Sequence, residues 1–231
     1  MFWQEDEDKT PPWQAPEEIL DLSFAIRCKH LPQDHNWALA TAIKEHLPWI
    51  GEDHYSGIHS IHVAADANGW LRPEDGSEQL LIPSRRTRLL LRITKEKLED
   101  AQQLSGKTLD VAGHRLTVGA AKEKPLQHAA VLFARYVLAD ENQTEDDFLQ
   151  RMANEIQTHF DFKVRKMMCG RSHYLQTPDG PQSQQFTRHL MIADLNHDVS
   201  LRLQQLGLAG GKAFGCGLFL PHKEIKALKK V

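Results

Sequence analysis

The sequence Gly207-Leu-Ala-Gly-Gly-Lys-Ala-Phe-Gly-Cys-Gly-Leu-Phe-Leu-Pro-His-Lys223 surrounds one lysine and one phenylalanine with five glycines and then continues as an apolar segment. Glycine tolerates positive φ and lets the backbone approach a ligand closely, so consecutive N–H groups can converge on an anion. Lys212 would add positive charge to such a site. The pattern predicts a phosphate-binding loop, with a plain turn between a helix and an edge strand as the alternative. The glycines concerned are Gly207, Gly210, Gly211, Gly215 and Gly217.

The order of elements around this loop argues against two common nucleotide motifs. A dinucleotide-binding fingerprint follows a strand and opens a helix, whereas this loop follows a predicted helix and opens a predicted strand from Phe214 to Leu220. A P-loop needs a hydroxyl after its lysine to bind magnesium, and Ala213 stands there instead. Nucleotide-dependent catalysis is therefore disfavoured.

Composition limits the class of protein. The 231 residues, of which 41% are apolar, suffice for one large domain or two domains of about 100 residues each. The chain contains no run of about 18 apolar residues, and it begins with an acidic rather than a basic and apolar segment. Three scattered cysteines do not form a disulfide framework or a zinc motif. We expect a cytoplasmic protein without membrane partners.

Charge is distributed unevenly along the chain. The formal net charge is −3, yet residues 1–33 carry seven acids against three lysines or arginines, a balance of −4. Residues 161–231 carry eleven lysines or arginines against five acids, a balance of +6. The C-terminal third is therefore a candidate polyanion-binding region.

Hydrophobic periodicity and turn residues predict the same element order twice, β-α-β-β-α-β. This order indicates an α+β fold of two tandem ferredoxin-like domains with a C-terminal glycine-rich loop. We expect an acidic lead-in over residues 1–18, a first domain over 19–124 and an RNA-binding second domain over 125–231. The predicted elements are strand 19–28, a helix capped by Asp34 over 35–47, strands 57–65 and 87–93, helix 94–104, strands 108–111 and 115–118, then strand 130–138, a helix opened by Thr144, strands 164–168, 172–175 and 186–193, helix 196–206 and strand 214–220.

Several short motifs add up to a family resemblance. They are Leu31-Pro-Gln-Asp34-His35, Leu47-Pro-Trp49, Gly69-Trp70-Leu-Arg72-Pro73, Ser84-Arg-Arg-Thr-Arg88, Arg165-Lys-Met-Met-Cys-Gly-Arg171 and the end of the glycine-rich loop. With the tandem fold, they make the chain resemble the CRISPR-associated repeat-cleaving endoribonucleases of the RAMP superfamily, in particular the myxobacterial-type subtype.

The resemblance implies cleavage of precursor CRISPR RNA within its repeat, without a metal or other cofactor. The 2′-hydroxyl would attack the adjacent phosphate to give a 2′,3′-cyclic phosphate and a 5′-hydroxyl. It also implies that the protein stays on the crRNA beside other Cas proteins of an effector complex. A non-catalytic crRNA-binding subunit of such a complex is the alternative, and an unrelated binder of a phosphorylated small molecule is a third hypothesis.

This chemistry needs proton transfer, for which histidine is suited at neutral pH. The resemblance places a catalytic histidine on or just after the first helix, and it leaves four candidates together with a neighbouring tyrosine: His35, His46, His54, His59 and Tyr55. For each, a structural role is the competing interpretation. A metal site of His54, His59 and His62 is disfavoured, because residues three apart on a strand point to opposite faces.

Basic and glycine residues supply the candidate RNA contacts. The alternative for each basic residue is a solvated surface position. The set is Arg85, Arg86, Arg88, Lys163, Arg165, Lys166, Arg171, Gly210, Gly211, Lys212, Gly215 and Gly217.

Overall fold

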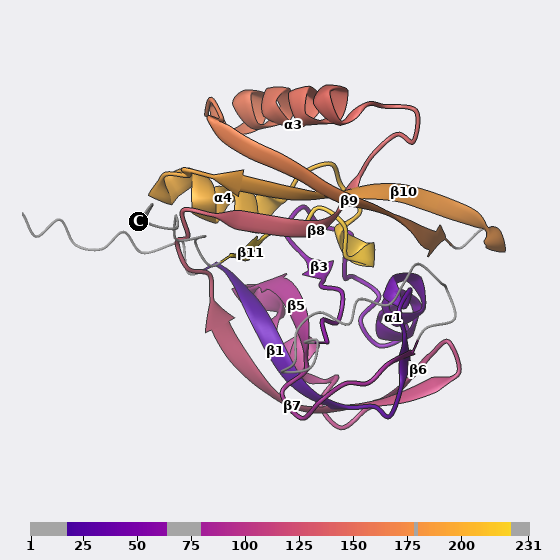
Figure 1. The fold of residues 1–231 in the computed structure, drawn as a ribbon. Helices are drawn as coiled ribbons and strands as arrows, with labels where there is room; N and C mark the ends of the chain where they lie inside the picture. Colours follow the sequence, from indigo (N-terminus) through magenta and orange to yellow (C-terminus); the bar gives the residue numbers. More distant parts are fainter. Residues whose placement is uncertain (1–17, 64–79, 178–179, 223–231) are drawn as a thin grey trace, which may run out of the picture.

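Two antiparallel sheets, one from each half of the chain, form the framework of this mixed α/β fold (Figure 1). The computed structural model describes residues 18–63, 80–177 and 180–222. Predictions that fall on other residues, such as the motif around Trp70 and Arg72 and the acidic lead-in, lie outside the described part. No helix in the described ranges is long and apolar enough to cross a membrane.

The first sheet is built around β1, whose predicted alternation is confirmed. Leu20, Leu22, Phe24 and Ile26 are buried on one face of this strand. Helix α1 (Asn36–Lys44) contributes to the same apolar cluster. In spatial order the strands are β3 (Gly57–Ile58), β5 (Arg88–Thr94), β1 (Ile19–Arg27), β7 (His114–Pro125) and β6 (Thr108–Val111). A 3₁₀ turn η1 (Lys95–Lys97), helix α2 (Leu98–Gln102) and the short pair β2 (Leu31–Pro32) and β4 (Leu80–Leu81) complete this half.

The second sheet carries two helices on one face (Figure 1). Its strands, in spatial order, are β11 (Leu220–Pro221), β8 (Leu132–Leu138), β10 (Gly180–Ala193) and β9 (Lys166–Thr177). Helix α3 (Glu145–Phe160) begins as predicted at Thr144, whose hydroxyl accepts a hydrogen bond from the Asp147 N–H. Its apolar stripe and that of α4 (His197–Leu206) pack into one buried cluster with the sheet.

Both sheets share one strand order. When the edge strand β6 is left aside, the first long strand of each half lies between the third and fourth strands, and the second strand is at the edge beside the third. Each half has its own apolar cluster, and a small third cluster of Ile19, Leu126 and Leu201 lies where the halves meet. The predicted boundary near residues 120–128 falls on β7, which continues to Pro125 before the chain crosses to the second sheet.

Four local predictions are wrong. Asp34 does not cap α1; its carboxylate accepts a hydrogen bond from Gln176 N–H of β9, while His35 is the N-cap residue. Of the predicted strand 57–65, the described residues up to 63 form only the two-residue β3, and the strands 164–168 and 172–175 form one strand, β9. The strand over 214–220 is reduced to β11, because the glycine-rich segment packs as a loop up to Leu218.

Candidate functional site

The loop after α1 presents His54 and Tyr55 to solvent. Asp53 fixes the loop, since its carboxylate accepts hydrogen bonds from the N–H groups of Tyr55 at 2.6 Å and Ser56 at 2.5 Å. The Ser56 hydroxyl accepts from the Gly51 N–H at 2.7 Å. Tyr55 is 39% exposed, and the His54 side chain is exposed as well. A short, internally bonded turn therefore holds these two side chains outward.

Lys212 joins this loop to the glycine-rich loop. Its Nζ donates a hydrogen bond to the His54 carbonyl, and Ala213 lies directly against Gly51. Burial lowers the pKa of Lys212 to about 8, although the nearby Asp53 carboxylate opposes the shift. An ammonium group has three donors, so two remain for a ligand after the contact with His54. The structure thus brings together His54, Tyr55 and Lys212, which are distant in the sequence.

Most of the glycines in this loop are required by packing within the protein. A Cβ on Gly217 would lie 2.0 Å from the Leu208 carbonyl oxygen, and one on Gly207 would lie 2.4 Å from the Gly217 carbonyl oxygen. On Gly215 a Cβ would contact Asn36 of α1 at 3.0 Å. At Gly210, in contrast, nothing lies within 4 Å, and φ is +74°. At Gly210, therefore, glycine is favoured by the positive φ and not by packing, and the space around its Cα is open.

Successive N–H groups at the turn of the loop are available to an anion. The N–H groups of Gly210, Gly211 and Lys212 make no hydrogen bond to another residue within the described part of the chain. Gly210 and Gly211 both have positive φ, which turns neighbouring amides toward a common side. Lys212 supplies one of these N–H groups and also the ammonium that reaches the His54 carbonyl.

Phe214 anchors the loop on α1. Its ring lies 4.6 Å from that of Trp37, and the Lys44 ammonium lies 5.1 Å from its centroid. The Asn36 side-chain amide donates to the Phe214 carbonyl at 3.0 Å. The loop from the second half is thus held against the first helix, which fixes Lys212 relative to His54.

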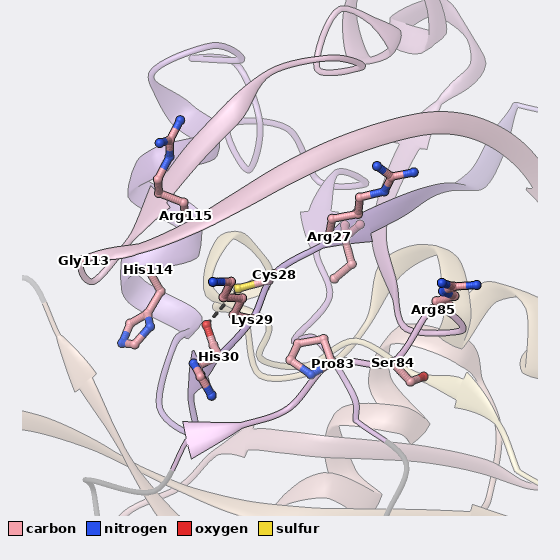
Figure 2. Close-up of a pocket in the computed structure, with 11 residues that line it drawn as sticks. Arg27, Cys28, Lys29, His30, Pro83, Ser84, Arg85, Gly113, His114 and Arg115 are labelled. Atoms are coloured by element: carbon pink, nitrogen blue, oxygen red, sulfur yellow. Dashed lines mark hydrogen bonds between the residues drawn. The ribbon is translucent and has the colours of Figure 1, made fainter.

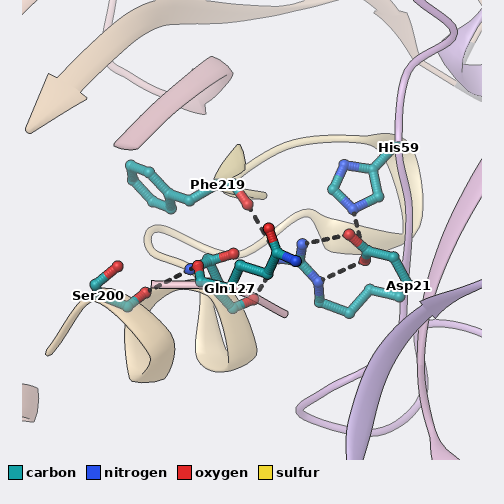
Figure 3. A network of polar contacts seen from close by, with 7 residues as sticks. Asp21, His59, Gln127, Ser200 and Phe219 are labelled. Atoms are coloured by element: carbon teal, nitrogen blue, oxygen red, sulfur yellow. Dashed lines mark hydrogen bonds and ion pairs between the residues drawn. The ribbon is translucent and has the colours of Figure 1, made fainter. Parts of the chain in front are cut away.

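A buried polar network also joins the two halves (Figure 3). Arg92, fully buried on β5, binds both carboxylate oxygens of Asp21, at 2.9 and 3.1 Å. It also donates to the carbonyls of Gln204 on α4 and Phe219 beyond the glycine-rich loop. Burial raises the pKa of Asp21, but the charges of Arg92 and His59 outweigh it and hold that pKa well below its usual range.

Two of the four candidate histidines lie in the interior. His59 is 4% exposed, with Nε2 3.4 Å from the Asp21 carboxylate, and burial lowers its pKa. His35 is 1% exposed; Nδ1 donates to the Pro32 carbonyl and Nε2 accepts from the Ile61 N–H. Burial lowers the pKa of His35 to about 4. Both are placed to support the fold, whereas His46, at the end of α1, and His54 are exposed.

The basic candidates do not gather at the glycine-rich loop. Lys163, Arg165 and Lys166 are exposed at the start of β9, and Lys166 pairs with Asp194. Leu175 is the residue of β9 that packs with Cys216 of the glycine-rich loop. It follows Lys166 by nine residues, which is about 30 Å in an extended strand. Arg171 lies between them and is exposed. Arg88 begins β5 of the first sheet, and Arg85 and Arg86 lie in the turn before it.

The sequence analysis missed a row of rings on the second sheet. His173 and His189 face each other across β9 and β10 with their Nε2 atoms 2.8 Å apart. Phe133 on β8 packs edge-on against His189, His222 follows beyond it, and Tyr136 packs against His173. Alternation alone could have placed these residues opposite the apolar face, but their pairing depends on the register of three strands.

Comparison with known proteins identifies the family. The family model described as Cas6 Crispr matches residues 20–224, from β1 to beyond the glycine-rich loop. This chain belongs to the Cas6 family. The match confirms the resemblance inferred from the motifs. The chain is also 29% identical over 203 residues to the CRISPR-associated endonuclease Cas6 of Myxococcus xanthus (strain DK1622), covering 88% of this chain and 81% of that protein.

Solved structures share the fold at low sequence identity. A structure described as CRISPR associated protein Cas6 superimposes on this Cas6-family chain with a TM-score of 0.58 at 12% identity, covering 89% of this chain and all of the other. One described as a RAMP protein binding different RNA substrates gives 0.59 at 12% identity, covering 88% and 100%. A Cas6-related protein from Pyrococcus furiosus gives 0.55 at 13% identity, covering 89% and 99%.

Proposed function

We propose that this Cas6-family chain is an endoribonuclease that cleaves precursor CRISPR RNA within its repeats. The observation that carries the proposal is the clamp between Lys212 and the His54 carbonyl, which holds an exposed histidine and tyrosine beside the glycine-rich loop. Family membership and the endonuclease from Myxococcus xanthus support the reaction class. His54 is the catalytic residue in this proposal, because His35 and His59 are buried and His46 is separated from the Lys212 contact.

The proposed reaction needs only groups of this chain and the RNA. His54 takes the proton of the 2′-hydroxyl as its oxygen forms a bond to the adjacent phosphorus, the bond from phosphorus to the 5′-oxygen breaks, and that oxygen receives a proton from water or from Tyr55. The products are a 2′,3′-cyclic phosphate and a 5′-hydroxyl. Lys212 and the amides of Gly210 and Gly211 stabilise the charge that develops on the phosphorane oxygens.

The repeated strand order supports a finer description of the fold. In both sheets the order of strands, counted within each half, is second, third, first, fourth, with β6 added at one edge. This is the order of a ferredoxin-like βαββαβ unit. We therefore interpret the chain as two tandem ferredoxin-like domains, over residues 19–124 and 125–231, with the glycine-rich loop of the second docked on α1 of the first.

The test compares His54→Ala with His46→Ala. Both replace an exposed histidine, one just after α1 and one in the following loop, so both variants should fold. Of the two residues, His54 is the one whose carbonyl accepts the Lys212 hydrogen bond. Purified proteins are incubated with the cognate repeat RNA in excess EDTA, and the 3′ ends of the products are determined. We expect a cyclic phosphate from the wild type, a loss of about 100-fold or more in the cleavage rate for His54→Ala, and wild-type behaviour for His46→Ala.

Binding distinguishes the remaining hypotheses. Equal cleavage by His54→Ala and the wild type would remove His54 from the mechanism. Tight RNA binding without cleavage by the wild type would instead indicate the non-catalytic crRNA-binding subunit. Binding of nucleotides in preference to single-stranded RNA would indicate the small-molecule alternative.

The proposal includes retention of the product. The docked glycine-rich loop and the basic residues on both halves give the RNA a large binding surface. Cleavage at one phosphate would leave most of these contacts in place. We expect crRNA to remain bound after cleavage and the protein to join other Cas proteins of an effector complex in that state. Co-purification of processed RNA with the full chain measures retention of the crRNA directly.

A further inference from the structure

A basic pocket lies in the first half of the chain, and its lining residues all belong to that half (Figure 2). Its volume is about 700 Å³, and it lies between the end of β1, the turn before β5 and the hairpin of β6 and β7. Besides the Cys28 thiol, the titratable side chains that line it are those of Arg27, Lys29, His30, Arg85, His114 and Arg115, and no carboxylate of the described residues lines it. Five of these six side chains are exposed, and His114 is half-buried.

The walls of this pocket are held by local hydrogen bonds. Arg88 donates to the carbonyls of Arg85 at 2.8 Å and Thr87 at 2.9 Å, which fixes the turn that carries Arg85. The Cys28 thiol donates to the His30 carbonyl at 2.8 Å, which fixes the segment that leaves β1. The cations therefore project from ordered backbone, and they keep their charged ends in water.

The pocket continues a basic face of the first sheet. Residues of β1 opposite the apolar core are Asp21, Ser23, Ala25 and Arg27 in alternation. Their register partners add Lys124 and Lys122 on β7 and Arg88 on β5 to the same face, and all three are exposed. Two acids lie among these positions: Asp21, which is buried and paired with Arg92, and Asp110, the partner of Arg115, whose carboxylate accepts a hydrogen bond from the Gly113 N–H. The net charge of this face is positive.

One end of this face lies at the contact with the second half. Asp21 pairs with Arg92, which reaches the carbonyl of Phe219 beyond the glycine-rich loop. Arg27 follows Asp21 by six residues on the same strand, about 20 Å in an extended chain. The pocket therefore lies about 20 Å along β1 from the contact between the halves.

We propose that this basic face and its pocket bind the phosphates of a single-stranded segment of the same RNA, away from the scissile phosphate. The proposal rests on the proposed function, since it extends the substrate of that site. Exposed, separated cations on a sheet suit a flexible phosphate backbone better than a compact ligand, which requires convergent donors in an enclosed site. The pocket residues are binding residues and take no part in the bond-breaking step.

The test compares two double variants of equal net charge. Lys29→Ala with Arg115→Ala removes two cations from the pocket, and Lys95→Ala with Lys107→Ala removes two exposed cations that do not line it. Affinity for the cognate repeat RNA with its single-stranded flank is measured between 50 and 200 mM salt. We expect the pocket variant to lose about tenfold in affinity and about 1.4 in the slope of log K against log salt, and the control to stay near wild type.

Cleavage kinetics separate this proposal from the proposed function. The pocket variant should keep kcat at saturating RNA and show a raised KM, because the removed contacts do not touch the reacting atoms. Equal affinity of the two variants, or an affinity loss in which kcat also falls, overturns the pocket as an RNA-binding surface while leaving cleavage by the wild type intact. Binding of inorganic pyrophosphate that is lost in the pocket variant but leaves RNA binding unchanged would also overturn it, since the ligand would then be a small anion. An absence of RNA binding by the wild type would refute both.

Discussion

Two contacts between the halves of this molecule use similar residue types to different ends. In the buried network, Arg92 and His59 surround Asp21 with almost no solvent exposure, and the Arg92 guanidinium donates to groups of the protein. In the loop contact, Lys212 reaches the backbone beside His54, and the imidazole remains in water. A charged group that is buried and paired contributes to assembly of the fold, whereas an exposed group held by its backbone is available for chemistry.

The largest effect should come from breaking the buried network. Arg92→Met leaves the Asp21 carboxylate buried without its partner, which costs about 3 to 5 kcal/mol in the free energy of unfolding. Lys122→Met, on β7 of the same sheet but exposed, should change it by less than about 0.5 kcal/mol. Urea unfolding of both variants measures the difference.

A second substitution sharpens this test. Asp21→Leu combined with Arg92→Met removes both charges and should recover a large part of the lost stability, because an apolar pair of similar volume often replaces a buried ion pair without cost. If the double variant is as unstable as Arg92→Met alone, the instability comes from lost packing or from the carbonyls of Gln204 and Phe219, and the assignment of the network to charge pairing is wrong.

An intermediate effect on the free energy of unfolding is expected from the buried His35 when the pH is lowered. Its pKa in the folded protein is about 4, because burial disfavours the charged form, whereas the unfolded chain has the ordinary value near 6.5. The unfolded state therefore binds the extra proton, and the free energy of unfolding falls as the pH decreases from about 6.5 to about 4. The loss attributable to His35 is about 3 kcal/mol at the acid end.

Urea unfolding at pH 7, 5.5 and 4.5 checks this expectation against His35→Gln. The variant does not titrate at that position, so its stability should fall less steeply than that of the wild type. His46→Gln, which replaces an exposed histidine, serves as the control and should follow the wild-type curve. Parallel curves for all three proteins would contradict a neutral His35 in the folded state.

The smallest effect is expected at Lys212. Burial lowers its pKa to about 8, so its positive charge is present at pH 7 and largely lost at pH 9. If Lys212 contacts an RNA phosphate, affinity for the repeat RNA should fall a few-fold over this range, since about one phosphate contact is lost. Lys212→Arg stays charged and should bind equally well at both pH values. A wild-type affinity that is independent of pH would remove Lys212 from the phosphate contact.

The regular elements were largely predictable because their patterns are local. The strand β1 is predicted by the alternation of Leu20, Leu22 and Phe24. The helix α3 is predicted by the hydroxyl of Thr144 and the apolar stripe that follows it. The glycine-rich segment was predicted to open a strand, and it forms a loop instead. Its conformation depends on α1 and β3, which lie about 150 residues earlier in the chain.

The sequence by itself determined the family, the mixed α/β class, the repeated element order and the positions of the glycines and histidines. These properties follow from composition, periodicity and motifs, which are read along one chain. Only the tertiary structure decided which histidines are buried, that Lys212 lies at the His54 loop, and that the cations at 85 and 115 share a pocket. The physical reason is that burial and proximity arise from strand register and docking between the halves, and neither is encoded by neighbouring residues alone.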